Sequence, residues 1–152
     1  MNKRPTWEEL WLRIARDLSY RSHDPDTKHG AVIVSRDNIV LGAGYNGYPR
    51  GGGEENYPDT RPEKYRYIIH AEANAICQCQ GGRQPDSVIY VTGLPCSNCF
   101  GLIIQAGIKR VVCGPTSSWC VDEDEVEAVK LMTKVHDIRV QIFSEWPDES
   151  WR

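Results

Sequence analysis

Apolar side chains near the start of the chain recur at the spacing of one helical face: Trp7, Leu10, Trp11, Ile14 and Leu18. Thr6 and Glu9 flank the start of this run in the order of a capping box, in which each side chain bonds the backbone N–H of the other residue. The pattern predicts a helix over about residues 6–20 that packs one apolar stripe against the rest of the protein.

Beyond this helix, short β-branched runs alternate with helical segments. The runs predict five strands, the first two joined as a hairpin through Arg36-Asp37-Asn38: residues 31–35, 39–43, 88–91, 111–113 and 140–143. Three further helices are expected over residues 70–80, 95–107 and 124–133. The order α-ββ-α-β-α-β-α-β predicts a three-layer α/β/α sandwich with a mixed five-stranded sheet. A loop dense in Gly and Pro, residues 49–62, interrupts this alternation.

Length and composition are those of an ordinary globular protein. With 152 residues, 40% hydrophobic and 26% charged, residues 1–152 are expected to form a single domain. Lys and Arg number 18 against 21 Asp and Glu, a net charge of −3 that disfavours nucleic acid as a partner. The sequence has no apolar signal core and no run of about 20 apolar residues, so we expect a cytoplasmic protein without a membrane partner. Its six cysteines are then reduced thiols or metal ligands.

The most informative residues are His70-Ala71-Glu72, followed 23 residues after Glu72 by Pro95-Cys96-Ser97-Asn98-Cys99. This H-x-E…P-C-x-x-C arrangement is the signature of zinc-dependent nucleobase deaminases. One imidazole and two thiolates leave the fourth tetrahedral position of zinc open for water, as in catalytic sites. Glu72 lies about 200° around the helix from His70, so it cannot share the metal and is expected to carry protons to and from the water.

Each part of this motif is weaker on its own. A lone C-x-x-C is often half of a zinc ribbon or a redox pair, but no second pair at suitable spacing is present. Cys77, on the same helical stripe as His70, is expected to fill core. A second metal site that includes His23, His29 or Cys120 is left open, because no spacing demands it.

The sequence resembles deoxycytidylate deaminases, in the cytidine-deaminase-like superfamily, from about Trp7 to Phe143. Besides the zinc motif, the resemblance rests on these blocks: Arg21-Ser22-His23-Asp24-Pro25, Gly30-Ala31-Val32-Ile33-Val34, Gly44-Tyr45-Asn46-Gly47-Tyr48-Pro49-Arg50-Gly51 and Gln105-Ala106-Gly107-Ile108. It implies hydrolysis of dCMP to dUMP and ammonia by a zinc-activated hydroxide, with Glu72 as general acid and base. The dUMP would supply thymidylate synthesis. Phage-encoded members are similarly compact, so a phage origin is left open.

The resemblance also implies substrate contacts. Asn46 would hold the deoxyribose, although Asn46-Gly47 is also a common tight turn. Ala71 would contact the substrate from the zinc motif. Arg21 and Ser22 would lie near its phosphate and Trp119 would wall the same pocket, the alternatives being a solvated arginine and a surface tryptophan.

Regulation follows from the resemblance as well. Many members are homohexamers activated by dCTP and inhibited by dTTP, with Mg²⁺ on the triphosphate. The effector site would be bordered by Gly44, Tyr45, Gly47 and Arg50, although the loop that begins here also has the composition of a flexible surface loop.

Four other functions remain to be separated from dCMP deamination. The chain could deaminate dCTP, free cytidine nucleosides or a polynucleotide, or it could be a non-catalytic zinc module that senses nucleotides. The net charge disfavours the polynucleotide. The presence of Glu72 beside an open metal position disfavours the sensing module.

Overall fold

A mixed five-stranded sheet forms the centre of the protein, as the sequence predicts. The computed structural model describes residues 3–117 and 122–150. Strands β1 (Gly30–Val34) and β2 (Val40–Tyr45) form an antiparallel hairpin, and β1 also pairs antiparallel with β3 (Val88–Val91). Strands β4 (Arg110–Cys113) and β5 (Arg139–Ile142) continue parallel to β3, which gives the order β2-β1-β3-β4-β5.

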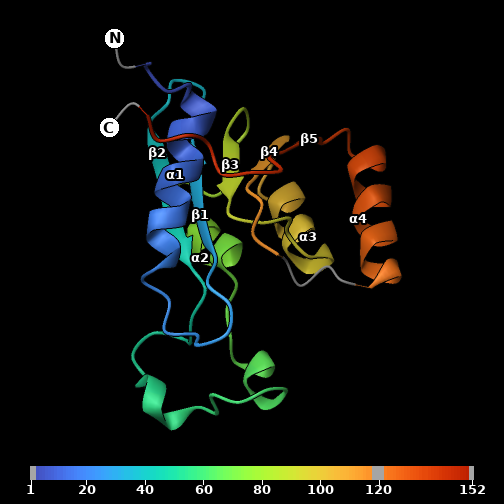
Figure 1. Ribbon diagram of the computed structural model, residues 1–152. Coiled ribbons are helices and arrows are strands. Elements are labelled where there is room, and N and C mark those ends of the chain that lie inside the picture. Colours follow the sequence, from blue (N-terminus) through green and yellow to red (C-terminus); the bar gives the residue numbers. More distant parts are fainter. Residues whose placement is uncertain (1–2, 118–121, 151–152) are drawn as a thin grey trace.

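Helices cover both faces of this sheet (Figure 1). Helix α1 (Trp7–Ser19) packs on the face formed by Val32, Tyr90 and Val112. On the other face, helices α2 (Ala71–Gln78), α3 (Ser97–Gln105) and α4 (Glu123–Val135) contribute to a second core with Ile33 and Val111. The result is the predicted three-layer sandwich.

Helix α1 begins as predicted, and the predicted stripe packs against the sheet through Trp11, Ile14 and Leu18, although the most buried positions lie to one side of it. The Thr6 hydroxyl accepts from the Glu9 N–H at 3.2 Å and the Glu9 carboxylate accepts from the Thr6 N–H at 2.7 Å, so the capping box is confirmed. The buried residues are Trp11, Leu12, Ala15 and Ser19, whereas Trp7 remains 47% exposed and stacks on Trp11. The small Ala15 faces Gly30, where a Cβ would lie 1.9 Å from the Ala15 carbonyl oxygen. Close contact between the helix and β1 therefore decides which positions are most buried.

Helix α2 lies directly on β2. A Cβ at Gly44 would lie within 2.6 Å of the Ala75 backbone nitrogen, and one at Gly42 within 2.3 Å of the Ala75 carbonyl oxygen. The side of the helix that faces the sheet carries Ala71 and Ala75, and Cys77 is exposed. The expectation that Cys77 fills the core is therefore wrong.

The Gly- and Pro-rich loop lies within a longer insertion, residues 46–70, that extends from the end of the sandwich (Figure 1). It contains two short 3-10 helices that the sequence analysis does not predict, Glu54–Asn56 and Glu63–Arg66. Lys64 anchors the insertion: its side chain is fully buried and its Nζ donates to Asp24 at 2.9 Å and also to Asp26. No helix of the described residues has the length and apolar character needed to cross a membrane.

Candidate active site

Three side chains with metal-ligand atoms meet at the starts of two neighbouring helices. His70 is the N-cap of α2, Cys96 is the N-cap of α3, and Cys99 lies in the first turn of α3. The His70 Nδ1 is 3.5 Å from the Cys96 Sγ and 3.4 Å from the Cys99 Sγ, and all three ligand atoms lie within 4.8 Å of one another. The structure therefore brings together the three ligands that the sequence predicts.

These distances fit a zinc ion. Zinc–nitrogen and zinc–sulfur bonds of about 2.0–2.1 and 2.3 Å at the tetrahedral angle place the two ligand atoms about 3.5 Å apart. The observed separations of 3.4 and 3.5 Å match this value. Residues His70, Cys96 and Cys99 could thus hold zinc through one nitrogen and two sulfurs.

The surroundings of Cys96 favour a thiolate. The hydrogen bond from the Cys99 thiol, together with the contact to His70, lowers the pKa of Cys96 against the opposing effect of burial. The start of α3 is itself held from another element: the Glu125 carboxylate of α4 accepts from the Ser97 N–H at 2.9 Å and from the Ser97 hydroxyl at 2.8 Å. Glu125 thereby fixes the helix turn that carries both cysteines. The sequence does not predict this role, because Glu125 lies in a run of acidic residues and nothing local distinguishes it from them.

Glu72 lies in a pocket beside the three ligands, the metal-side pocket, and its side chain is only 5% exposed. Burial raises the pKa of its carboxyl group, although the charge of His70 and a backbone hydrogen bond oppose the shift. The pocket is lined by His29, Asn46, His70, Ala71, Glu72, Leu94 and Cys96. A buried carboxyl group beside a metal-ligand cluster is the arrangement needed for proton transfer.

Two of the predicted substrate residues, Asn46 and Ala71, line this pocket. The Asn46 side chain is also hydrogen-bonded to the loop that precedes β1: its Oδ1 accepts from the His29 N–H at 2.7 Å, and its Nδ2 donates to the Thr27 carbonyl at 2.9 Å. Ser22 is buried and donates to the Asn46 carbonyl at 2.7 Å. The loop from Ser22 to His29 and the end of β2 are therefore one hydrogen-bonded unit at the pocket.

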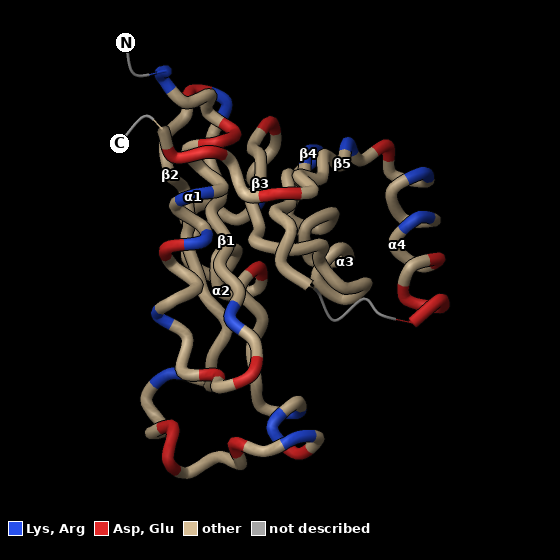
Figure 2. The backbone as a smooth tube through the Cα atoms, viewed as in Figure 1, with Lys and Arg blue, Asp and Glu red and all other residues tan. Residues whose placement is uncertain are grey.

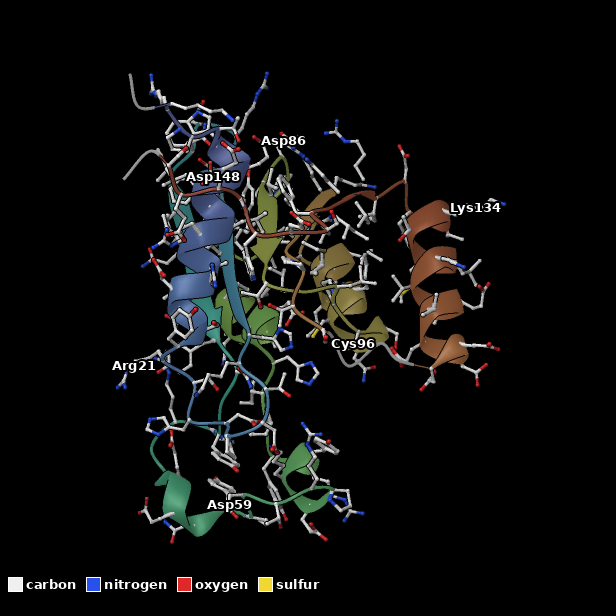
Figure 3. The ribbon with its side chains drawn as sticks, viewed as in Figure 1. Arg21, Asp59, Asp86, Cys96, Lys134 and Asp148 are labelled. Carbon is white, nitrogen blue, oxygen red and sulfur yellow. The ribbon has the colours of Figure 1, made fainter. Side chains whose placement is uncertain are left out.

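Arg21, a further predicted substrate residue, is not among the described residues that line the pocket. Arg21 is exposed at the end of α1, and its side chain extends away from Cys96 (Figure 3). Trp119 lies outside the described residues. Contact of either residue with substrate stays a prediction.

The four residues predicted to border an effector site do come together. Gly44, Tyr45, Gly47 and Arg50 line a cavity of about 180 Å³ beside α2. Asn74 of α2 also lines it and donates to the Tyr45 carbonyl at 2.8 Å. Because Ala71 and Glu72 of the same helix line the metal-side pocket, α2 separates the two cavities and contacts both.

His29 is a pocket residue whose position the sequence analysis misses. It lies just before β1, and its Nδ1 is 2.9 Å from the Thr92 hydroxyl at the end of β3. Burial, with a smaller effect of the charge on His70, lowers the pKa of His29 to about 4. A histidine between a polar loop and the apolar run 31–34 is a weak signal, because nothing local indicates the pairing with residue 92.

Among the described residues, only one group can hold a metal ion through three ligands. His23 is exposed and its Nδ1 lies 3.0 Å from the Glu54 carboxylate, while Cys120 lies outside the described part of the chain. A larger cavity of about 370 Å³ occurs at the opposite end of the strands, near Arg36, Arg110 and Arg139. Ligands of open α/β sheets bind at the carboxyl ends of the strands, where the metal-side pocket lies.

A three-layer sandwich with one nitrogen and two sulfur ligands at two adjacent helix starts defines a zinc-dependent deaminase. The model of the cytidine and deoxycytidylate deaminase zinc-binding region matches residues 5–115, and the chain belongs to this family.

Individual relatives agree with this assignment. A probable deoxycytidylate deaminase of Caenorhabditis elegans is 40% identical over 107 residues, which are 68% of this chain and 54% of the worm protein. The deoxycytidylate deaminase of Mus musculus is 35% identical over 144 residues, covering 91% of this chain and 80% of the mouse protein. The dCMP deaminase of cyanophage S-TIM5, solved with dCMP and dUMP, shares the fold with a TM-score of 0.70 at 24% identity, over 93% of this chain and 99% of that one.

Proposed function

We propose that this protein hydrolyses dCMP to dUMP and ammonia. The observation that carries the proposal is the convergence of His70, Cys96 and Cys99 beside the buried Glu72 in one pocket. The names of the mouse and worm relatives support the choice of substrate. Figure 2 supports a small ligand over a polynucleotide, because Lys and Arg alternate with Asp and Glu along α1 and the insertion.

The residues divide the chemistry between them. His70, Cys96 and Cys99 would hold zinc, which supplies Lewis-acid activation of water when bound. Glu72 takes one proton from the attacking water and passes it to ring N3, and it then passes the proton of the hydroxyl group formed on C4 to the departing amine. A C–O bond forms at C4, the exocyclic C–N bond breaks, and ammonia leaves. The raised pKa of Glu72 suits this role because a group that both accepts and donates protons works best near the operating pH.

The decisive experiment compares wild type with Glu72→Gln on dCMP. We expect the variant to bind one equivalent of zinc and to lose at least about 10²-fold in kcat, because the amide cannot accept the proton. Glu127→Gln on the exposed face of α4 is the matched control and should retain full activity. Wild-type protein without dCMP turnover, or a fully active Glu72→Gln, would refute the proposal. Running dCTP, deoxycytidine and single-stranded DNA in parallel separates the alternative substrates, and turnover of none would indicate a nucleotide-sensing module.

We propose that Asn46 and Ala71 hold the nucleoside and that Arg21, Ser22 and Trp119 serve the phosphate end. The positions of Asn46 and Ala71 in the pocket support the first part. For the second part, Ser22 is joined to Asn46 through its hydroxyl and lies next to Arg21 in the chain. The support for the phosphate end is therefore the family resemblance and this adjacency.

Regulation by nucleoside triphosphates is a further part of the proposal. The cavity lined by Gly44, Tyr45, Gly47 and Arg50 would take dCTP as activator or dTTP as inhibitor, with Mg²⁺ on the triphosphate. The contact of Asn74 with Tyr45 offers a route through α2 to Glu72. A homohexamer is proposed from the same resemblance. The dCMP assay repeated with dCTP, with dTTP and with Mg²⁺ tests the regulation.

We also propose that the dUMP supplies thymidylate synthesis and that the protein works in the cytoplasm. The site requires Cys96 and Cys99 as thiolates, and a reducing compartment keeps thiols available for zinc. Sedimentation velocity tests the assembly. The metabolic role is tested by measuring whether the protein lowers the thymidine requirement of a host that lacks its own dCMP deaminase.

A further inference from the structure

The ring of His29 has one nitrogen that the fold does not use. The side chain is only 6% exposed, and its Nε2 is buried without a hydrogen-bond partner among the described residues. Buried polar atoms in native proteins nearly always have a partner, and an unpaired one carries the penalty of its lost hydration. The Nε2 therefore requires an explanation, and the position of the ring in the wall of the metal-side pocket supplies one.

Hydrogen bonds on the other side of the ring assign its proton. The Thr92 hydroxyl oxygen already accepts from the Gly30 N–H at 3.2 Å and lies 2.9 Å from the His29 Nδ1. Among the described residues, His29 Nδ1 is the acceptor within reach of the Thr92 hydroxyl hydrogen. We assign this hydrogen to the bond with Nδ1, so in the neutral ring Nε2 carries the proton and is a donor.

We infer that His29 is a substrate-binding residue whose Nε2–H donates to an oxygen of the pyrimidine nucleoside, the 2-oxo group or a sugar oxygen. The inference rests on the proposed function, because it names a contact of that same site. The cavity inside the pocket is small, about 10 Å³, so a pyrimidine enters only if the walls move apart and then lies in contact with them. Ala71 and Glu72 are part of the same wall, which places His29 at the base and sugar of the nucleotide.

The backbone of His29 ties this donor to a second pocket residue. Its N–H donates to the Asn46 Oδ1 at 2.7 Å, and the Asn46 N–H donates to its carbonyl at 3.2 Å. Thr92 fixes the ring from β3 and Asn46 fixes the main chain from the end of β2. The donor is thus held in position before substrate binds, which reduces the entropy lost on binding.

Two substitutions distinguish the role of the Nε2–H donor from that of the imidazole ring as a whole. In His29→Gln the amide nitrogen can occupy the place of Nε2 and keep the donor in the pocket. In His29→Asn the shorter amide reaches only the place of Nδ1, so it keeps the contact with Thr92 and removes the pocket donor. Wild type and both variants are assayed with dCMP and with deoxycytidine, and the dissociation constant of dUMP is measured by calorimetry. Zinc content and melting temperature of each variant establish that the fold is retained.

We expect His29→Asn to raise KM for dCMP and for deoxycytidine by the same factor of about ten, with a much smaller change in kcat and a matching loss of dUMP affinity. His29→Gln should remain within about threefold of wild type. Equal losses in both variants, or wild-type behaviour of His29→Asn, would overturn the inference. So would a loss confined to dCMP, since it would place the contact at the phosphate. A wild type that deaminates deoxycytidine but not dCMP would refute the proposed function, while the ratio of the two variants on deoxycytidine would still decide the role of His29.

Discussion

At the residue scale, His29 makes stability depend on pH. Burial and the charge of His70 lower the pKa of His29 from 6.5 to about 4, so between these values the unfolded chain binds a proton that the folded protein excludes. The contribution of the neutral ring to the free energy of unfolding is complete above pH 6.5. This contribution is lost as the pH falls toward 4, and the whole loss in the free energy of unfolding is about 3 kcal/mol.

This pH dependence can be isolated with His29→Gln, which has no titrating ring. We expect urea unfolding to show that wild type loses about 2 kcal/mol more than the variant between pH 7.5 and pH 5. Because both proteins share the metal ligands and carboxylates, their common pH dependence cancels in this difference. Parallel losses in the two proteins would contradict a neutral, buried His29.

The candidate site also shows at the residue scale what a sequence can reveal. The three ligands and Glu72 were predictable because they lie in two short local motifs, each at a helix start, and the ligand set has a chemical signature. The contact of His29 with Thr92 was not predictable, because the two residues are 63 positions apart in the chain and meet only where β1 pairs with β3. Glu125 was missed for the same reason, because it reaches Ser97 from a different helix.

At the scale of elements, the regular helices and strands were predicted and the irregular ones were not. Periodicity and the capping box located α1 to within a residue at each end. The two 3-10 helices of the insertion have no such periodicity, and Lys64 in the second of them is buried only through contacts with the distant loop at Asp24 and Asp26. Long-range ion pairs of this kind leave no local pattern in the sequence.

The contact between α2 and β2 leads to a prediction about this element pair. A Cβ at Gly44 would lie 2.6 Å from the Ala75 nitrogen and 2.7 Å from the Ala71 carbonyl oxygen, both backbone atoms that cannot rotate away. We expect Gly44→Ala to lower the free energy of unfolding by about 1–3 kcal/mol and to reduce kcat, because α2 carries Glu72. Chemical denaturation and dCMP turnover are the measurements.

Gly101 provides the matched control for this substitution. It lies in α3, is exposed, and a Cβ there would have no atom within 4 Å. Gly101→Ala should leave activity unchanged and stabilise the protein by about 0.5–1 kcal/mol, since alanine favours the helix. If Gly44→Ala is as well tolerated as Gly101→Ala, the close packing of α2 on β2 is not what positions Glu72.

At the scale of the whole molecule, Lys64 joins the insertion to the sandwich. Burial opposes the charge of Asp24, but hydrogen bonds from Lys64 and from the N–H groups of Asp26 and Thr27 outweigh it and lower the pKa of Asp24. The loop held in this way runs from Ser22 to His29, and its last residue, His29, lines the pocket. Lys64 is therefore the buried ion-pair contact between the insertion and this loop, beside the exposed contacts of Arg61 with Asp26 and Thr27.

Lys64→Met tests this connection, because it keeps the length of the side chain and removes the charge. Asp24 would then remain buried without its partner, and we expect a loss of about 3 kcal/mol in the free energy of unfolding with a rise in KM for dCMP. The double variant Lys64→Met/Asp24→Asn should recover part of the stability, since the amide oxygen still accepts from the N–H groups of Asp26 and Thr27 and no charge is left unpaired. Lys130→Met breaks the exposed pair with Glu127 and should cost less than about 1 kcal/mol. A Lys64→Met protein as stable as Lys130→Met, with unchanged KM, would show that the insertion does not support the pocket through this ion pair.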